Sequence, residues 1–219
     1  MIRAVLFDLD GTLADTERLQ WEAYRRVLLR HGVDLPLDLY RRRFIAVAGG
    51  AEWAVATYGL PLAAAALRAA KADEYQRLIA ARVEPMPGAR AALERLRPTH
   101  ALAVATNTAR AEVGVIMGHL GIRPLLDAVI AREDYAAAKP APDAYLAAAA
   151  ALGCPPGACV VVEDTPRGLQ AGRAAGMRVV AVPSDLTADQ DFTGATRRID
   201  HLDALGPDLL DALDGDARA

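Results

Sequence analysis

The stretch IRAVLFDLDGT, residues 2–12, decides the fold of this 219-residue chain. Its apolar run ends at two acidic residues, Asp8 and Asp10, and Gly11 follows directly. A short apolar run of this kind is typical of a strand buried in a parallel sheet. Glycine tolerates backbone conformations that other residues avoid, so the chain can turn at Gly11 and both carboxylates can face one pocket. The stretch therefore predicts a buried first strand with polar chemistry at its carboxyl end.

Four more short apolar strands are expected downstream, over residues 102–105, 128–131, 159–162 and 179–182. Helices are expected between them, over residues 88–97, 109–120, 142–152 and 166–175. This alternation predicts a parallel sheet with right-handed crossovers and helices on both faces. The predicted fold class is therefore α/β, with a doubly wound, Rossmann-like parallel sheet.

Residues 15–87 interrupt the alternation. This segment has no convincing strand, and its helical patterns are separated by turns rich in glycine and proline at residues 49–50, 59–61 and 85–88. We therefore expect a helical insertion directly after the first strand. The predicted domains are a core of residues 1–14 and 88–219 and an α-helical cap domain of residues 15–87.

Polar residues follow three of the expected strands, and one lysine lies in the loop before residues 142–152. They are Asp8 and Asp10, Thr106 and Asn107, Glu163 and Asp164, and Lys139. Because the carboxyl ends of parallel strands meet at one edge of the sheet, these side chains are expected to line one crevice.

Four carboxylates in one crevice would repel one another and hold protons unless a cation lay between them. With no His or Cys nearby, the oxygen ligands favour Mg2+. A carboxylate, here Asp8, can then attack a phosphate, while Asp10 acts as general acid and base. Lys139, the Thr106 hydroxyl and the amides near Asn107 would stabilise the charge of the transferred group. Singly, each motif also has a structural explanation, such as helix capping, so the interpretation depends on their joint occurrence.

These motifs resemble those of the haloacid dehalogenase superfamily of phosphotransferases, and the resemblance covers nearly the whole chain. Residues 7–13, FDLDGTL, are similar to its first motif, and Thr106, Lys139 and the acidic pair of residues 163–164 to the other three. The resemblance implies subfamily I, with a helical cap. It also implies a phosphorylated Asp8 and an acid-base role for Asp10.

The same resemblance implies which groups hold Mg2+. They are the carboxylates of Asp8, Glu163 and Asp164 and the backbone carbonyl of Asp10.

Within the superfamily the chain is most similar to the CbbY-like sugar-phosphate phosphatases, which are relatives of β-phosphoglucomutase. Residues 46–50 in the cap and residues 183–187 and 191–195 carry this similarity. It implies that Lys71 holds a non-reacting phosphate of the substrate, although an exposed helix lysine is an equal alternative. Glu17 and Asn107 are further candidates for binding the substrate, and Arg43 and Arg77 are other polar residues of the cap.

The departures from these relatives refine the predicted activity. The cap lacks the arginine of the mutases' Gly-x-Ser-Arg element, and Gln20 stands where mutases have a histidine, so a hydrolase is favoured. Asp10 argues against the dehalogenases and the phosphonate-cleaving branch, which lack this acid. Ala51 replaces a basic residue expected in CbbY-like caps, which argues against xylulose-1,5-bisphosphate as the substrate.

The predicted function is therefore Mg2+-dependent hydrolysis of a small phosphomonoester, a sugar phosphate, by a phosphoric monoester hydrolase. One alternative is a hexose-phosphate mutase that uses the same aspartates. Another is a non-catalytic binding protein on the same fold, against which the full set of motif residues argues.

Composition narrows the possible partners. Apolar residues make up 53% of the chain and the formal net charge is -3, which favours a folded core and offers no attraction to nucleic acid or an anionic membrane. The short arginine runs at residues 41–43 and 197–198 fit exposed helix or loop faces. A cytoplasmic protein is expected, since no signal or membrane-spanning segment is evident. Its expected partner is a phosphorylated small molecule, and a monomer is expected because cap and cleft could both be complete in one chain. Cys154 and Cys159 are expected to be packing thiols, not a disulfide or half of a metal site.

Overall fold

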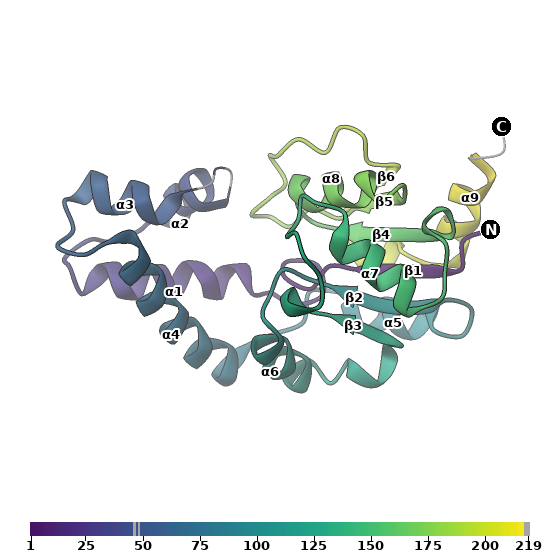
Figure 1. Cartoon of the computed structure of the whole chain (residues 1–219), viewed down its shortest axis with the longest axis horizontal. Coiled ribbons are helices and arrows are strands. Elements are labelled where there is room, and N and C mark those ends of the chain that lie inside the picture. The colour runs from purple at the N-terminus through teal and green to yellow at the C-terminus, as the bar shows by residue number, and fades with distance from the viewer. Residues whose placement is uncertain (46, 48, 217–219) are drawn as a thin grey trace. The chain divides into compact units, whose positions relative to one another are not determined.

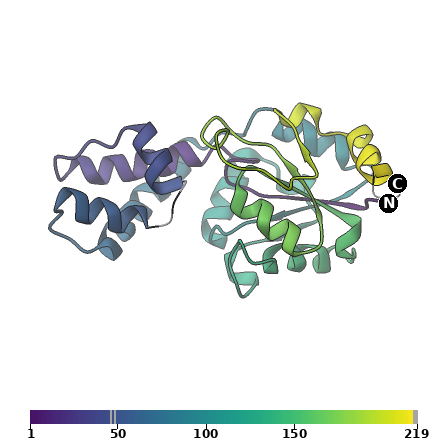
Figure 2. The same cartoon turned by 90° about the horizontal axis from the view of Figure 1, so that it is seen from above.

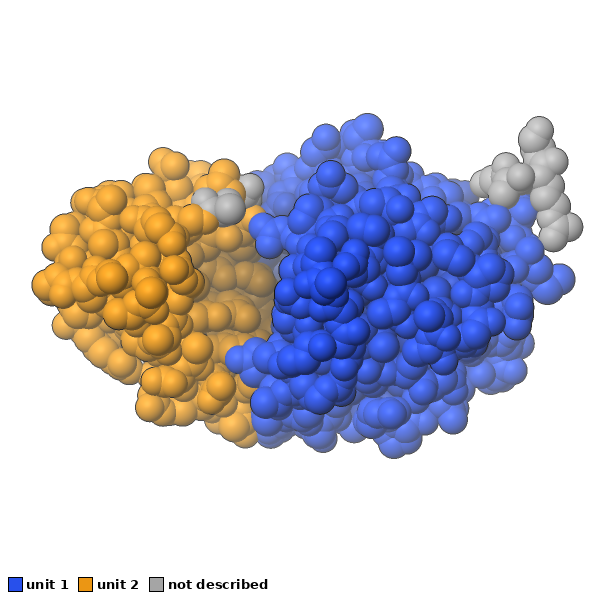
Figure 3. Space-filling model, viewed as in Figure 1, with its two compact units in different colours: residues 1–15, 84–219 blue, residues 16–83 orange. Residues whose placement is uncertain are grey.

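The structure is a computed structural model and describes residues 1–45, 47 and 49–216. The chain forms two compact units, coloured separately in Figure 3: residues 1–15 with 84–219 (unit 1), and residues 16–83 (unit 2). Residues 84–87, which the sequence assigns to the cap, belong to unit 1, where the Asp15 amide donates to the carbonyl of Glu84.

Unit 1 contains a parallel sheet of six strands with helices on both faces, in the order β3-β2-β1-β4-β5-β6 (Figures 1 and 2). The strands are β1 (Ala4–Phe7), β2 (Ala101–Ala105), β3 (Ala128–Ile130), β4 (Cys159–Glu163), β5 (Arg178–Ala181) and β6 (Arg197–Arg198). The central strand β1 pairs with both β2 and β4, so that Phe7 lies opposite Val104 and Val162. The predicted α/β fold is confirmed, and β1 to β5 lie at the five predicted places.

Strand β6 was not predicted. Arg197 and Arg198 pair with Val180 and Ala181 of β5 at the edge of the sheet, so the expectation of a helix or loop face is wrong for them. Both arginines are exposed, as expected. An edge strand has a partner on one side only and needs no apolar run, which is why its sequence gives no strand signal.

The helices of unit 1 are α5 (Ala89–Leu96), α6 (Arg110–Leu120), α7 (Asp143–Ala151), α8 (Pro166–Ala174) and α9 (Pro207–Asp216). Short 3-10 turns lie at η2 (Arg123–Leu125), η3 (Arg132–Asp134), η4 (Pro156–Ala158) and η5 (Leu202–Ala204). Helices α7 and α8 share one buried cluster with alternate residues of the strands, among them Leu6 and Val161. Because side chains alternate along a strand, this packing leaves the other face of the sheet to other helices.

The regular elements described in unit 2 are all helical, and turns and irregular segments join them. Unit 2 contains α1 (Glu17–Leu29), α2 (Leu37–Tyr40), a π-helical turn η1 (Arg41–Ile45), α3 (Gly50–Tyr58) and α4 (Ala64–Arg82). The segment of residues 46–50 was singled out in the sequence, but Ala46 and Ala48 lie outside the described residues. Aromatic rings fill part of the core, and Phe44 contacts Tyr24, Tyr40 and Trp53.

Cys154 and Cys159 are buried free thiols, which confirms their prediction as packing residues. Among the described helices, none has the length and apolar character that a membrane span requires.

Candidate active site

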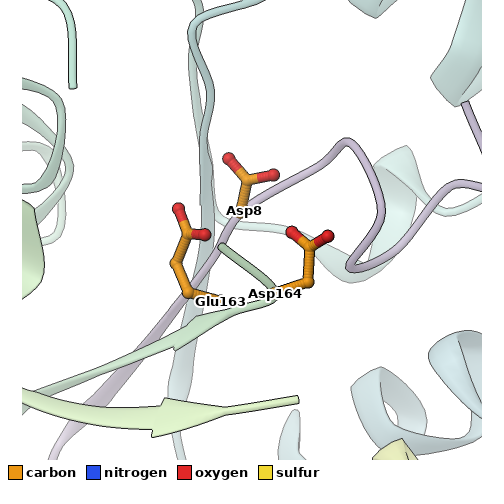
Figure 4. Close-up of side chains that lie close together, drawn as sticks. All are labelled: Asp8, Glu163 and Asp164. Carbon is orange, nitrogen blue, oxygen red and sulfur yellow. The ribbon is translucent and has the colours of Figure 1, made fainter. Parts of the chain in front are cut away.

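Three acidic side chains converge where β1 and β4 end. Asp8 follows β1, Glu163 is the last residue of β4, and Asp164 follows it. Each offers a carboxylate oxygen, and these oxygens lie within 4.8 Å of one another; Figure 4 shows the three side chains together. All three residues are buried, with Asp8 only 7% exposed. The adjacent strand ends therefore concentrate negative charge where water has little access.

Lys139 offsets part of this charge. Its ammonium nitrogen lies 2.5 Å from Asp8 Oδ1 and 2.7 Å from Glu163 Oε1, and the residue is 6% exposed. Lys139 lies in the loop between η3 and α7, 131 positions from Asp8 in the sequence. The crossover from β3 to β4 thus places one cation between two of the three acids.

Glu163 is held from several sides. Its Oε1 accepts hydrogen bonds from Lys139 and from the Tyr145 hydroxyl at 2.7 Å, and its Oε2 accepts from the Thr165 hydroxyl at 3.0 Å. Thr165 is also the N-cap of α8, since its hydroxyl accepts from the amide of Gly168. Thr165 therefore caps the N-terminus of α8 and also holds the carboxylate of Glu163. Glu163 itself is not the N-cap of α8.

Asp10 lies with the end of β2. Its Oδ2 accepts hydrogen bonds from the Thr106 hydroxyl at 3.1 Å and the Thr108 hydroxyl at 2.5 Å. Its carboxylate is therefore not part of the acidic group formed by the other three. Thr106 caps no helix, because α6 begins at Arg110 and the Thr106 hydroxyl accepts instead from the Thr108 amide.

The turn after β1 depends on a glycine. Gly11 has a φ of 79°, in the left-handed region, and a β-carbon there would lie 2.2 Å from Asp164 Oδ2. The next residue, Thr12, donates its hydroxyl to Asp164 Oδ1 at 3.3 Å. Gly11 therefore turns the chain and also leaves the space that the third carboxylate occupies.

Asn107 is oriented by the backbone of Lys139. Its Oδ1 accepts from the backbone amide of Lys139 at 3.1 Å and lies 2.7 Å from the Tyr135 hydroxyl, whose single proton also has the carbonyl of Thr106 at 2.8 Å as an acceptor. Because a backbone amide can only donate, the side-chain atom that faces it is the carbonyl oxygen, so the NH2 group of Asn107 is the end left to donate.

The charges of the site affect one another. Burial raises the pKa of Asp8 to about 8, and the neighbouring Glu163 and Asp10 act in the same direction, whereas Lys139 opposes them. Burial lowers the pKa of Lys139, but the charges of Asp8 and Glu163 outweigh it, so the pKa of this ammonium lies above its usual value. The lysine therefore stays charged, and one ammonium does not neutralise the surrounding carboxylates.

A hard divalent cation fits this donor set. The three acids offer only oxygen ligands and are buried. Burial first, and then the neighbouring acids, raise the pKa of Asp8, so a further cation would stabilise its charged form. Oxygen ligands with this excess of negative charge suit Mg2+.

The two substrate-binding candidates of the cap lie in unit 2. The ammonium of Lys71 donates to Gln20 Oε1 and lies 4.6 Å from the ring centre of Tyr75 and 5.5 Å from that of Tyr24. Lys71 is half-buried and not fully exposed, and its role in binding a phosphate stays a prediction. Glu17 accepts from the Tyr40 hydroxyl at 2.5 Å.

The two arginines that the sequence analysis named as polar residues of the cap contact other side chains of unit 2. Arg43 lies over the ring of Trp53, and Arg77 pairs with Glu74.

Sequence reasoning missed the two tyrosines of the site, Tyr135 and Tyr145. Both are aromatic residues close to Lys139 in the sequence, and nothing in their spacing shows that their hydroxyls reach the site. Thr165 could have been found, because a threonine directly before a proline and a helical pattern is typical of an N-cap.

Comparison with known proteins agrees with this geometry. The family model described as haloacid dehalogenase-like hydrolase matches residues 2–176. The chain belongs to the haloacid dehalogenase-like hydrolase family. The expectation from the sequence is thereby confirmed, and the site described above lies wholly within the matched residues.

Named relatives of this hydrolase include phosphatases. It is 34% identical over 224 residues to the protein CbbY of Rhodobacter capsulatus, covering 97% of this chain and 99% of that one. It is also 34% identical over 186 residues to the fructose-1-phosphate phosphatase YqaB of Escherichia coli, covering 81% of this chain and 95% of that one. The expected similarity to the CbbY-like group is confirmed.

A solved structure supports the same grouping. The crystal structure of CbbY from Rhodobacter sphaeroides in complex with phosphate matches this hydrolase with a TM-score of 0.80 and 32% sequence identity, covering 96% of this chain and all of that one.

Proposed function

We propose that this hydrolase is a Mg2+-dependent phosphatase that cleaves a small phosphate monoester, a sugar phosphate, through a phospho-aspartate on Asp8. The observation that supports this best is the buried junction where Lys139 bridges Asp8 and Glu163 beside Asp164. The printed names of its relatives, a fructose-1-phosphate phosphatase among them, point to the same class of substrate.

In the first step a carboxylate oxygen of Asp8 attacks phosphorus, and the bond between phosphorus and the ester oxygen breaks. Asp10 gives a proton to that oxygen, which leaves as an alcohol. In the second step Asp10 takes a proton from water, whose oxygen attacks the phosphorus of the phospho-aspartate. The bond from phosphorus to Asp8 breaks, and inorganic phosphate leaves.

Other residues of the chain stabilise this transfer. Lys139 brings fixed positive charge to within 2.5 Å of the proposed nucleophile, and such preorganised charge is the main source of catalysis in phosphoryl transfer. We assign the Thr106 hydroxyl and the Asn107 side-chain NH2 to donation toward the phosphate oxygens. The Thr106 hydroxyl currently donates to Asp10, so this role requires Asp10 to release it.

Mg2+ would be held by the carboxylates of Asp8, Glu163 and Asp164 and by the backbone carbonyl of Asp10. When bound, it supplies the positive charge that lets an anionic phosphate approach an acidic site.

We assign unit 2 as the cap domain, which recognises the rest of the substrate. Lys71 is a cation held by aromatic rings and suits a second anionic group, whereas Glu17 can accept hydrogen bonds from sugar hydroxyls. A monomer in solution also stays a prediction, which sedimentation velocity can check.

The proposal is tested by phosphate release from a panel of sugar mono- and bisphosphates, with Mg2+ and with EDTA. Release that requires Mg2+ and is concentrated on one or two sugar phosphates is expected. Absence of release by folded protein with Mg2+ would contradict the proposal. Conversion of a hexose 1-phosphate to its 6-phosphate, dependent on a bisphosphate activator, would identify the mutase instead.

A further inference from the structure

The loop that carries Lys139 is anchored at several points. The Asp143 side chain, in the first turn of α7, accepts from the amide of Ala137 at 2.9 Å, and the backbone amide of Lys139 donates to Asn107. These bonds place the backbone of the lysine but not the end of its four-carbon side chain, which has several rotatable bonds.

Tyr145 holds that end. Its hydroxyl oxygen lies 2.8 Å from the Lys139 nitrogen, and its hydroxyl proton is donated to Glu163 Oε1 at 2.7 Å. Tyr145 lies two residues beyond Asp143 in the first turn of α7, and it is fully buried. One helix turn therefore anchors both the loop and the ammonium.

The hydrogen bonds of the ammonium are complete. A lysine has three donor protons, and three acceptors surround this one: Asp8, Glu163 and Tyr145. With two acceptors, the nitrogen could still swing around the line that joins those two acceptors. A third acceptor removes this freedom and determines the position of the nitrogen more closely.

We propose that Tyr145 is a positioning residue for the reaction: its hydroxyl accepts from Lys139 and donates to Glu163, and so holds the catalytic cation and one carboxylate of the metal site in place. This inference rests on the proposed phosphatase function. A tyrosine that only filled the core would gain nothing from its hydroxyl, because burying a hydroxyl costs free energy unless hydrogen bonds replace those to water.

The test is Tyr145→Phe, which keeps the buried ring and removes both hydrogen bonds. We expect kcat to fall about tenfold or more, since hydrogen bonds to charged groups are stronger than neutral ones. The KM for the best sugar phosphate of the panel should stay within about twofold, because Tyr145 is not assigned any contact with substrate. The half-saturating Mg2+ concentration should rise by about tenfold, as is usual when the partner of a metal ligand is removed.

Binding of Mg2+ is also measured directly, by titration calorimetry on the substrate-free protein. This readout does not depend on turnover, so it still tests Tyr145 if the wild-type protein releases no phosphate from the panel. In that case the proposed function fails, whereas weaker Mg2+ binding by the variant would still support the positioning of Glu163.

Tyr58→Phe is the matched control, because it removes a hydroxyl from a partly buried tyrosine of unit 2 with no assigned role. It should leave kcat and Mg2+ binding unchanged. The inference is overturned if folded Tyr145→Phe has wild-type kcat and Mg2+ affinity. It is also overturned if kcat falls only in proportion to the fraction of folded protein while Mg2+ affinity stays the same, since that result describes a purely structural tyrosine.

Discussion

Glu163 occupies the space that a side chain at residue 168 would need. A β-carbon on Gly168 would lie 1.7 Å from Glu163 Oε1, far closer than two such atoms can approach. Gly168 lies in the first turn of α8, and its amide donates to Thr165, which in turn donates its hydroxyl to Glu163. The start of α8 is therefore shaped to receive the carboxylate, and a small residue there is part of the site.

Gly168→Ala should displace Glu163. We expect phosphate release to fall about tenfold or more, because the carboxylate loses its place beside Lys139, and the melting temperature should fall as well. Steady-state kinetics and thermal unfolding check this. Gly118→Ala in α6 is the matched control: nothing lies within 4 Å of its β-carbon position, so it should keep full activity and gain up to about 1 kcal/mol of stability. Wild-type phosphate release by Gly168→Ala would contradict this prediction, because it would show that activity does not require the present position of Glu163.

Asp8→Asn should abolish turnover and leave the fold intact. The amide cannot form the proposed phospho-aspartate, so phosphate release should fall by about a thousandfold or more. Burial already raises the pKa of Asp8 to about 8, so a neutral side chain of the same shape is compatible with the site and the melting temperature should not fall. Phosphate release and thermal unfolding are compared with Asp208→Asn, an exposed acid in α9. Substantial activity in Asp8→Asn would refute the phospho-aspartate mechanism.

Glu74→Gln should destabilise the protein through unit 2. The Glu74 side chain is 7% exposed and contacts Arg26, Arg30 and Arg77 at 3.0, 2.6 and 3.0 Å. We expect a loss of about 1 kcal/mol in the free energy of unfolding at pH 7, measured with denaturant. The carboxylate has three charged partners, but these arginines are exposed and remain solvated when Glu74 is neutralised. Glu94→Gln, which breaks an exposed pair with Arg90, should cost less than about 0.5 kcal/mol. Equal losses of unfolding free energy in the two variants would mean that the buried position and extra partners of Glu74 add no stability beyond that of an exposed ion pair.

The cost of Glu74→Gln should depend on pH in a defined direction. Hydrogen bonding from Arg26 is the largest cause that lowers the pKa of Glu74 below its ordinary 4.5. The unfolded chain therefore takes up this proton more readily, so the contribution of Glu74 is complete above about pH 4.5 and is lost as pH falls through the folded-state pKa. When the denaturation is repeated at pH 4 and below, the difference in unfolding free energy between the wild-type protein and Glu74→Gln should become smaller.

The two thiols should react slowly in the folded protein. Burial raises the pKa of Cys159 to about 11, which leaves about one thiol in a thousand ionised at pH 8. Mass spectrometry after brief alkylation at pH 8 should find both cysteines unmodified, and modified at both when the chain is first unfolded. Rapid alkylation of the folded protein, or an intact mass two hydrogens lower, would contradict the packing of Cys154 and Cys159.

Much of the fold could be predicted because its signals are local. Strands β1 to β5 are short apolar runs, and a strand buried on both faces of a parallel sheet has to be apolar along its length. Strand β6 could not be predicted, since Arg197 and Arg198 are polar and form a strand only because β5 offers a free edge.

The sequence by itself determined which chemistry this protein carries, because Asp8, Asp10, Lys139 and the acidic pair lie in short motifs at the ends of strands. Only the tertiary structure decided how these groups are arranged. Asp10 accepts from the hydroxyls of Thr106 and Thr108, just after β2, and Tyr145 joins Lys139 to Glu163. These contacts join residues that lie far apart in the sequence or on separate elements. The pairing of β1 with β2 and the packing of α7 against the sheet bring them within hydrogen-bonding distance.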